Sequence, residues 1–195
     1  MLKPVFASVL ALSAFALPAR AEDRPPIQPT RDVSVTYNVV GGQHGGTMRM
    51  TWDVTGNRMR VDTPGGHGYM IVDRAHRRGT MVMPQQHMYM EIDSNQIPQM
   101  GDMPDKDAKF SRGGTETIAG QSCTVWKFEA PDGSGTACLT ADGVMLRATA
   151  KDGQGLQATE VKYGPVAPAD FRLPDGYQKM DLGAMMQQGK PPQRR

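Results

Sequence analysis

The sequence predicts an all-β protein built around an antiparallel sheet. Apolar and polar residues alternate in short runs such as Val33–Val39 and Arg58–Asp62, and this period of two is typical of half-buried strands. In the second half, Asp-Gly pairs recur every ten residues, beginning at Asp132, Asp142 and Asp152. Asp-Gly between alternating runs is a strong hairpin signal. Hairpins pair strands that are neighbours in sequence, so the chain forms a sandwich, a barrel or a strongly curved sheet.

We expect roughly ten strands and almost no helix. The predicted strands are 33–39, 47–54, 58–62, 69–73, a hairpin through 81–90, and then 123–129, 136–141, 144–151 and 156–163. Between the two halves, residues 93–109 are polar, contain two prolines, and carry Met100 and Met103. We expect this segment to form a short helix or an ordered loop that crosses the sheet.

Methionine occupies every second position on both sides of a short turn in Met81–Met90, which reads MVMPQQHMYM. A hairpin here places Met83 opposite Met88 and Met81 opposite Met90. All four thioethers then share one face, because successive strand residues point to opposite sides. Such a face is apolar, flexible and polarizable. It suits an adaptable core, a cavity for an apolar ligand, or a soft metal such as Cu(I).

Several predicted strands turn large apolar side chains to this same side. The candidate ligand-binding face consists of Met48, Met50, Trp52, Met59, Met81, Met83, Met88 and Met90. A curved sheet buries its inner face fully only if something covers it, and an uncovered apolar face favours a ligand. The alternative is a copper site, because imidazole and thioether ligands select Cu(I). Its candidate ligands are Met81, Met83, His87, Met88 and Met90.

The first 21 residues have the features of a cleaved secretory signal peptide. A basic start is followed by an apolar run and by the small-x-small pattern Ala19-Arg20-Ala21. The apolar run is too short to span a membrane, and we find no later candidate span. We therefore expect an exported, periplasmic protein. Its expected parts are an extended lead-in at 22–31, one β domain at 32–178 and a flexible tail at 179–195.

Charge and motifs exclude several classes of function. The chain has 22 Lys and Arg against 20 Asp and Glu, and removal of Lys3 and Arg20 with the signal peptide brings the net charge to zero. We find no basic face with interleaved aromatic residues, so we do not expect nucleic-acid binding. No catalytic motif stands out, so we expect a non-enzymatic monomer without a cofactor, Cu(I) being the alternative.

The two cysteines, Cys123 and Cys138, lie on the two strands of one predicted hairpin. Strict pairing about the turn at 131–134 leaves them off register, so a bridge needs a bulge or a shifted loop. In an exported protein a disulfide is still the expected state.

The order of these segments resembles the LolA-like periplasmic superfamily, the outer-membrane lipoprotein carrier-like proteins. The resemblance covers roughly residues 32–178 and is closest to an uncharacterised branch, a domain of unknown function. It rests on these stretches: Trp52 with Arg58-x-Arg60-Val61-Asp62, residues 69–73, residues 81–91, residues 119–123, residues 138–147 and residues 169–177.

The resemblance implies a half-barrel, one curved antiparallel sheet with an apolar concave face. Founding members carry lipidated proteins by taking acyl chains into that cavity. This chain has little predicted helix to form a lid. A closed small barrel of lipocalin type is the alternative fold. For function, we expect a non-catalytic binding protein whose Met-rich concave face takes an acyl chain or another apolar envelope component.

Overall fold

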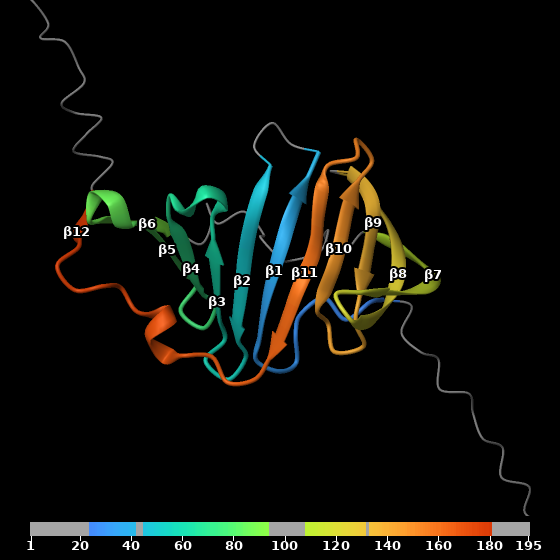
Figure 1. Ribbon diagram of the computed structural model, residues 1–195, viewed down its shortest axis with the longest axis horizontal. Helices are drawn as coiled ribbons and strands as arrows, with labels where there is room; N and C mark the ends of the chain where they lie inside the picture. Colours follow the sequence, from blue (N-terminus) through green and yellow to red (C-terminus); the bar gives the residue numbers. More distant parts are fainter. Residues whose placement is uncertain (1–23, 42–44, 94–107, 132, 181–195) are drawn as a thin grey trace, which may run out of the picture.

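The computed structural model describes residues 24–41, 45–93, 108–131 and 133–180. They form one curved sheet of twelve strands in the order β12-β6-β5-β4-β3-β2-β1-β11-β10-β9-β8-β7 (Figure 1). The expected all-β half-barrel is confirmed. The sheet begins and ends on different strands, β12 and β7, so the closed-barrel alternative is wrong.

The strands are short and alternate in burial, as the sequence predicts. The first meander contains β1 (Val33–Val40), β2 (Gly46–Asp53), β3 (Arg58–Asp62), β4 (Tyr69–Asp73), β5 (Arg78–Met83) and β6 (Met88–Asp93). The second contains β7 (Lys109–Ile118), β8 (Gln121–Ala130), β9 (Gly133–Leu139), β10 (Met145–Ala150) and β11 (Gly155–Tyr163). A short strand, β12 (Gln178–Lys179), and three 3-10 turns, η1 (Pro64–Gly66), η2 (Pro84–Gln86) and η3 (Pro168–Phe171), complete the described elements.

Two meanders meet in the middle of the sheet, where β1 pairs with β11. This junction differs from the expectation that every strand pairs with a sequence neighbour. The other difference is β12, which pairs with β6 in parallel. The remaining ladders are antiparallel hairpins, and β6 and β7 lie near opposite ends of the sheet.

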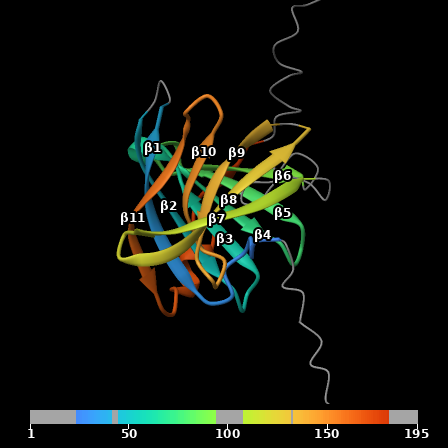
Figure 2. The ribbon, with the colours of Figure 1, turned by 90° about the vertical axis from the view of Figure 1, so that its right-hand side faces the viewer.

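The sheet curls, which turns the concave faces of the two meanders toward each other (Figures 1 and 2). Side chains of both meanders pack there into an inner core. Val33, Val35, Tyr37, Met59 and Leu146 are at most 1% exposed. The hydroxyl of Tyr37 donates a 2.7 Å hydrogen bond to the Met145 carbonyl, so the buried phenol is satisfied. Burial raises the pKa of Tyr37.

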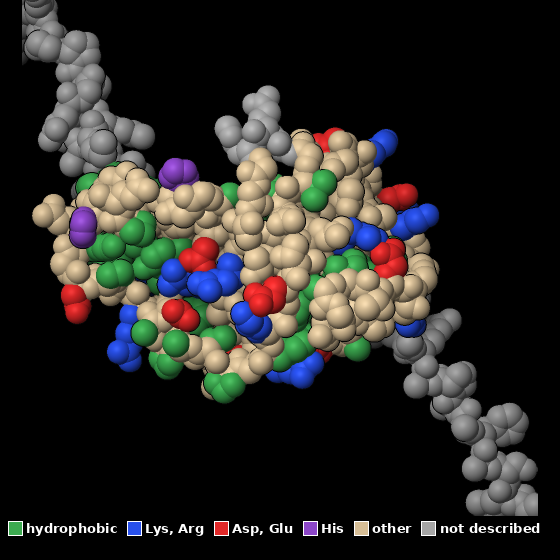
Figure 3. Space-filling model, in the orientation of Figure 1, with side chains coloured by type: hydrophobic (Ala, Val, Ile, Leu, Met, Phe, Trp, Pro, Cys, Tyr) green, Lys and Arg blue, Asp and Glu red, His purple; other side chains and the backbone are tan. Residues whose placement is uncertain are grey.

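A second apolar cluster lies on the outer face of β4–β6, where residues 164–180 cross the sheet. Tyr69, Ile71 and Val82 pack there against Phe171 of η3, with Tyr89, Val166 and Tyr177 at its margin. Figure 3 shows hydrophobic side chains gathered at this end of the outer face, beside a group of Arg, Lys, Asp and Glu side chains. We call residues 164–180 the C-terminal strap.

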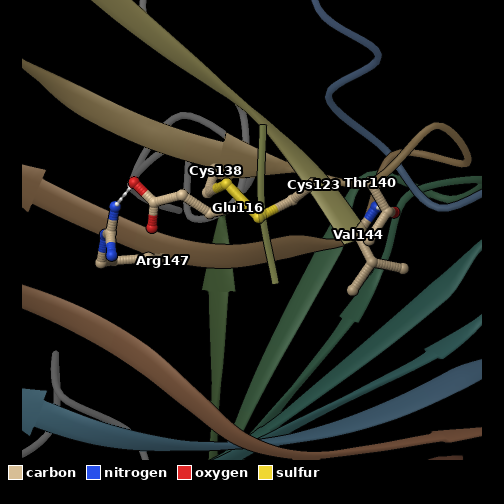
Figure 4. Close-up of a disulfide and its surroundings, with 6 residues drawn as sticks. All are labelled: Glu116, Cys123, Cys138, Thr140, Val144 and Arg147. Carbon is tan, nitrogen blue, oxygen red and sulfur yellow. Dashed lines mark hydrogen bonds and ion pairs between the residues drawn. A yellow bond between two sulfur atoms is a disulfide. The ribbon is translucent and has the colours of Figure 1, made fainter. Parts of the chain in front are cut away.

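Cys123 and Cys138 form the predicted disulfide, with their Cα atoms 5.4 Å apart. The β8–β9 ladder places Val125, and not Cys123, opposite Cys138, so the expected register offset is present. Glu116 and Arg147 form a 2.7 Å ion pair beside the bridge (Figure 4). Residues 1–21, the segment with Met100 and Met103, and most of the predicted tail lie outside the described residues.

Candidate functional site

The hairpin β5–β6 is built as the methionine pattern predicts. Met83 pairs with Met88 and Met81 with Met90, while Val82 pairs with Tyr89 on the other face. Pro84 opens the short turn η2, and His87 closes it with a left-handed backbone at φ 51°. The four thioethers therefore share the inner face.

The methionines continue a row of side chains that crosses five strands. Met50 pairs with Val61, Val61 with Met70, Met70 with Met81, and Met81 with Met90. Sequence reasoning did not select Met70, although it lies in the middle of this row and is 3% exposed. It follows Tyr69 in an apolar run without alternation, and periodicity alone cannot assign faces in such a run.

The eight predicted ligand-binding residues divide into two groups by burial. Met50, Trp52 and Met59 are buried, at 7%, 9% and 1% exposure, and belong to the inner core. The other five are half-buried, and we call them the methionine patch: Met48, Met81, Met83, Met88 and Met90. Met48 and Met81 pack against the core, so the patch is the partly open continuation of the packed face.

His87 contacts an aromatic ring of the outer-face cluster. Its ring lies edge-on to Tyr177, with the ring centroids 5.4 Å apart, and Tyr177 packs on the outer-face cluster. Among the described residues, no group of three His, Cys, Asp or Glu side chains could hold a metal. Cu(I) binding by Met81, Met83, His87, Met88 and Met90 stays a prediction, which a Cu(I) competition assay with Met88→Leu plus Met90→Leu tests.

An ion pair and backbone hydrogen bonds join the same strands to the strap. Lys179 of β12 contacts Glu91 of β6 at 2.6 Å, and the hydrogen bond and charge of Lys179 hold the pKa of Glu91 below its usual value. Gln178 and Met180 donate backbone hydrogen bonds to the carbonyls of His87 and Tyr89. The hairpin that carries four of the five patch methionines is therefore fixed along its β6 edge by β12.

A separate hollow lies where β2 ends and β3 begins, between the lead-in and the turn after β2. Its volume is about 50 Å³, and Gln28, Trp52 and Arg58 are among its lining residues. Burial would raise the pKa of Asp53, but hydrogen bonds from the Gly56 amide and from Arg58 outweigh it and lower that pKa. The guanidinium of Arg58 is therefore already paired with the carboxylate of Asp53.

These features define the fold as an open half-barrel, one curved antiparallel sheet with an apolar inner face. The chain belongs to the family described as "Domain of unknown function (DUF4412)", whose model matches residues 39–164. Comparison with curated proteins gives no match. No helix among the described residues is long and apolar enough to cross a membrane.

Solved structures share the fold at low sequence identity. An uncharacterised conserved protein from Thermus thermophilus is 14% identical, with a TM-score of 0.56, over 77% of this chain and 90% of that one. MucB is 13% identical, with a TM-score of 0.56, over 76% of this chain and 59% of MucB. The Pseudomonas aeruginosa MucA/MucB complex gives 15% identity, a TM-score of 0.53, and coverage of 74% and 56%.

Proposed function

We propose that the protein is an exported, non-catalytic binding module that takes an apolar ligand on its methionine patch. One observation carries the proposal: five methionines stay half-buried on the same face whose central residues form the buried inner core. Exposed apolar area favours a partner by about 25 cal/mol per Å² removed from water. Acyl chains and the apolar parts of other envelope components are the candidate ligands.

Export is supported by two features. The chain begins with the pattern of a secretory signal peptide, and Cys123 is joined to Cys138 in a disulfide, which persists in oxidising compartments. The fold adds a further support for binding, because one of the similar structures holds MucB with MucA. A half-barrel of this kind is thus compatible with a bound partner.

An environment-sensitive dye, anilinonaphthalene sulfonate, tests the patch directly. We expect saturable fluorescence enhancement with the wild type, weakened in Met83→Gln plus Met88→Gln, because two amides replace two apolar side chains. Met145→Gln is the matched control, since Met145 is also half-buried but packs on the outer face with Leu139. Equal dye binding by the two variants, or none by the wild type, contradicts the proposal.

A further inference from the structure

The oxidisable sulfur of this chain is methionine sulfur. The chain contains 15 methionines and two cysteines. Both cysteines are joined in the disulfide, where they are 2% and 1% exposed. The folded protein therefore presents no thiolate, the form of sulfur that oxidants attack first. A peroxide that reaches the protein meets thioethers as its sulfur targets.

Burial divides these thioethers into protected and reachable groups. Met50, Met59 and Met70 are 7%, 1% and 3% exposed, and all three belong to the inner core. The five residues of the methionine patch are half-buried, so each keeps part of its surface in water. Among the other described methionines, Met145 and Met180 are half-buried too. The patch is therefore the place where reachable thioethers gather on one face.

The neighbours of Met83 and Met88 leave this part of the patch open. Continuing the β4–β5 register by one residue places Gly68 opposite Met83. The Gly68 backbone passes so close to β5 that a Cβ there would lie 2.5 Å from the Val82 carbonyl oxygen. Gly68 brings no side chain over Met83. On the other side, Met88 is in register with Gln178 of β12, which is exposed.

Oxidation changes the chemistry of such a face without demanding a new fold. A sulfur lone pair attacks one oxygen of hydrogen peroxide, the S–O bond forms, the O–O bond breaks, and the departing hydroxide leaves with the proton as water. The thioether loses two electrons and becomes a sulfoxide, which is polar. Water can solvate this oxygen on a half-buried residue, whereas in the core it would be left without a hydrogen-bond donor. Because Met83 pairs with Met88, one sulfoxide also interrupts the apolar surface of its partner.

We propose that the methionine patch is a reversible oxidation site, at which a peroxide converts thioethers to sulfoxides and thereby switches off apolar binding while the core stays intact. This inference rests on the proposed function and adds the regulation of the same site. The reverse step belongs to methionine sulfoxide reductases, with one enzyme for each sulfoxide epimer. There, two thiols are oxidised to a disulfide, and the sulfoxide oxygen leaves as water.

The test combines peptide mapping with dye binding on the mature chain. Hydrogen peroxide is added in a time course, mass spectrometry locates each added oxygen, and anilinonaphthalene sulfonate is titrated before and after. In the patch variant, Leu replaces Met48, Met81, Met83, Met88 and Met90, which keeps the apolar bulk and removes the thioethers. Met145→Leu is the matched control outside the patch. Far-UV circular dichroism checks each fold, and Met83→Leu plus Met88→Leu replaces the fivefold variant if that one fails to fold.

We expect sulfoxides at the patch well before they form at Met50, Met59 or Met70. Peroxide should weaken dye binding by the wild type and by Met145→Leu about tenfold, and reductase treatment should restore it. The patch variant should keep its affinity after peroxide. Equal oxidation of core and patch, unchanged dye binding by the oxidised wild type, or equal loss in the patch variant overturns the inference and leaves the proposed function standing. No saturable dye binding before peroxide overturns the proposed function itself.

Discussion

At the scale of residues, the disulfide is protected by its neighbours. Cys123 and Cys138 are 2% and 1% exposed, and the ion pair of Glu116 and Arg147 lies next to them (Figure 4). Glu116 is in register with Cys123, and Arg147 with Cys138. The hydrogen bond from Arg147 lowers the pKa of Glu116, which keeps the carboxylate ionised beside the bridge. The bridge therefore joins two strands inside the core.

Removing the disulfide should weaken the fold measurably. The bond closes a loop with a sequence separation of 15. In the chain-entropy model, replacing both cysteines by serine lowers the free energy of unfolding by about 3 kcal/mol. Urea unfolding followed by tryptophan fluorescence measures this change. Trp126 lies on the same strand as Cys123, so its signal reports on this region. An unchanged midpoint, or two free thiols in protein taken from an oxidising compartment, contradicts the prediction.

At the scale of elements, two arginines of β3 contact the C-terminal strap, and Arg60 makes the polar contact. The guanidinium of Arg60 stacks 3.7 Å from the Tyr69 ring centroid and donates a 3.1 Å hydrogen bond to the carbonyl of Asp170. Arg58 lies 4.9 Å from the Phe171 ring centroid. These contacts tie η3 to β3, so the strap covers an apolar surface that would otherwise face water.

Arg60→Ala should loosen the strap without unfolding the sheet. The substitution removes a hydrogen bond from a charged donor together with a stacked cation. It should therefore destabilise the docked strap by about 1.5–3 kcal/mol. Hydrogen exchange at the amides of Gln178 and Met180 should accelerate, and exchange in β8–β10 should not. Arg49→Ala is the control, because Arg49 pairs with the same Asp62 as Arg60 but is 54% exposed. Equal acceleration in the two variants contradicts the assigned role of Arg60.

Acid should release the end of the strap. Lys179 lowers the pKa of Glu91 in the folded protein, so the ion pair stabilises the docked strap above the ordinary Glu pKa of 4.5. That contribution disappears as the pH falls below 4.5 through the folded-state pKa. Exchange at Met180, corrected for the intrinsic pH dependence, should rise over this range. Glu91→Gln should abolish this pH-dependent rise in exchange. If the rise persists in Glu91→Gln, a group other than Glu91 causes it.

The elements that sequence could predict are those with alternating burial. The β5–β6 hairpin and its register follow from methionine at every second position, and the Asp-Gly turns place most of the second meander. β7 was missed because it is an edge strand whose residues 109–117 are nearly all exposed, so it has no apolar alternation. β12 was missed because two exposed residues carry no pattern. Its place depends on strap contacts with residues far away in sequence.

At the scale of the whole molecule, curvature decides which inner-face residues are core and which are surface. The sequence places Met59 and Met88 on the same apolar face and cannot rank them, because alternation gives the side of a strand and not its depth. The structure separates them. Met59 is 1% exposed in the centre of the curled sheet, and Met88 is half-buried on the hairpin near its end. The depth of each site therefore comes from the curl that joins the two meanders.

This difference in burial predicts that replacing Met by Ala lowers the free energy of unfolding by different amounts at the two positions. Met59→Ala should lower the free energy of unfolding by about 2–5 kcal/mol, because it leaves a cavity among fully buried neighbours. Met88→Ala should cost well under about 2 kcal/mol, because a half-exposed side chain loses less apolar burial and leaves space that water can enter. Urea denaturation of the two single variants, with the slope of the transition held to the wild-type value, gives the comparison. Similar losses of unfolding free energy in the two variants would mean that the methionine patch is as closed as the core. A patch without exposed apolar area could not bind a ligand by burying that area.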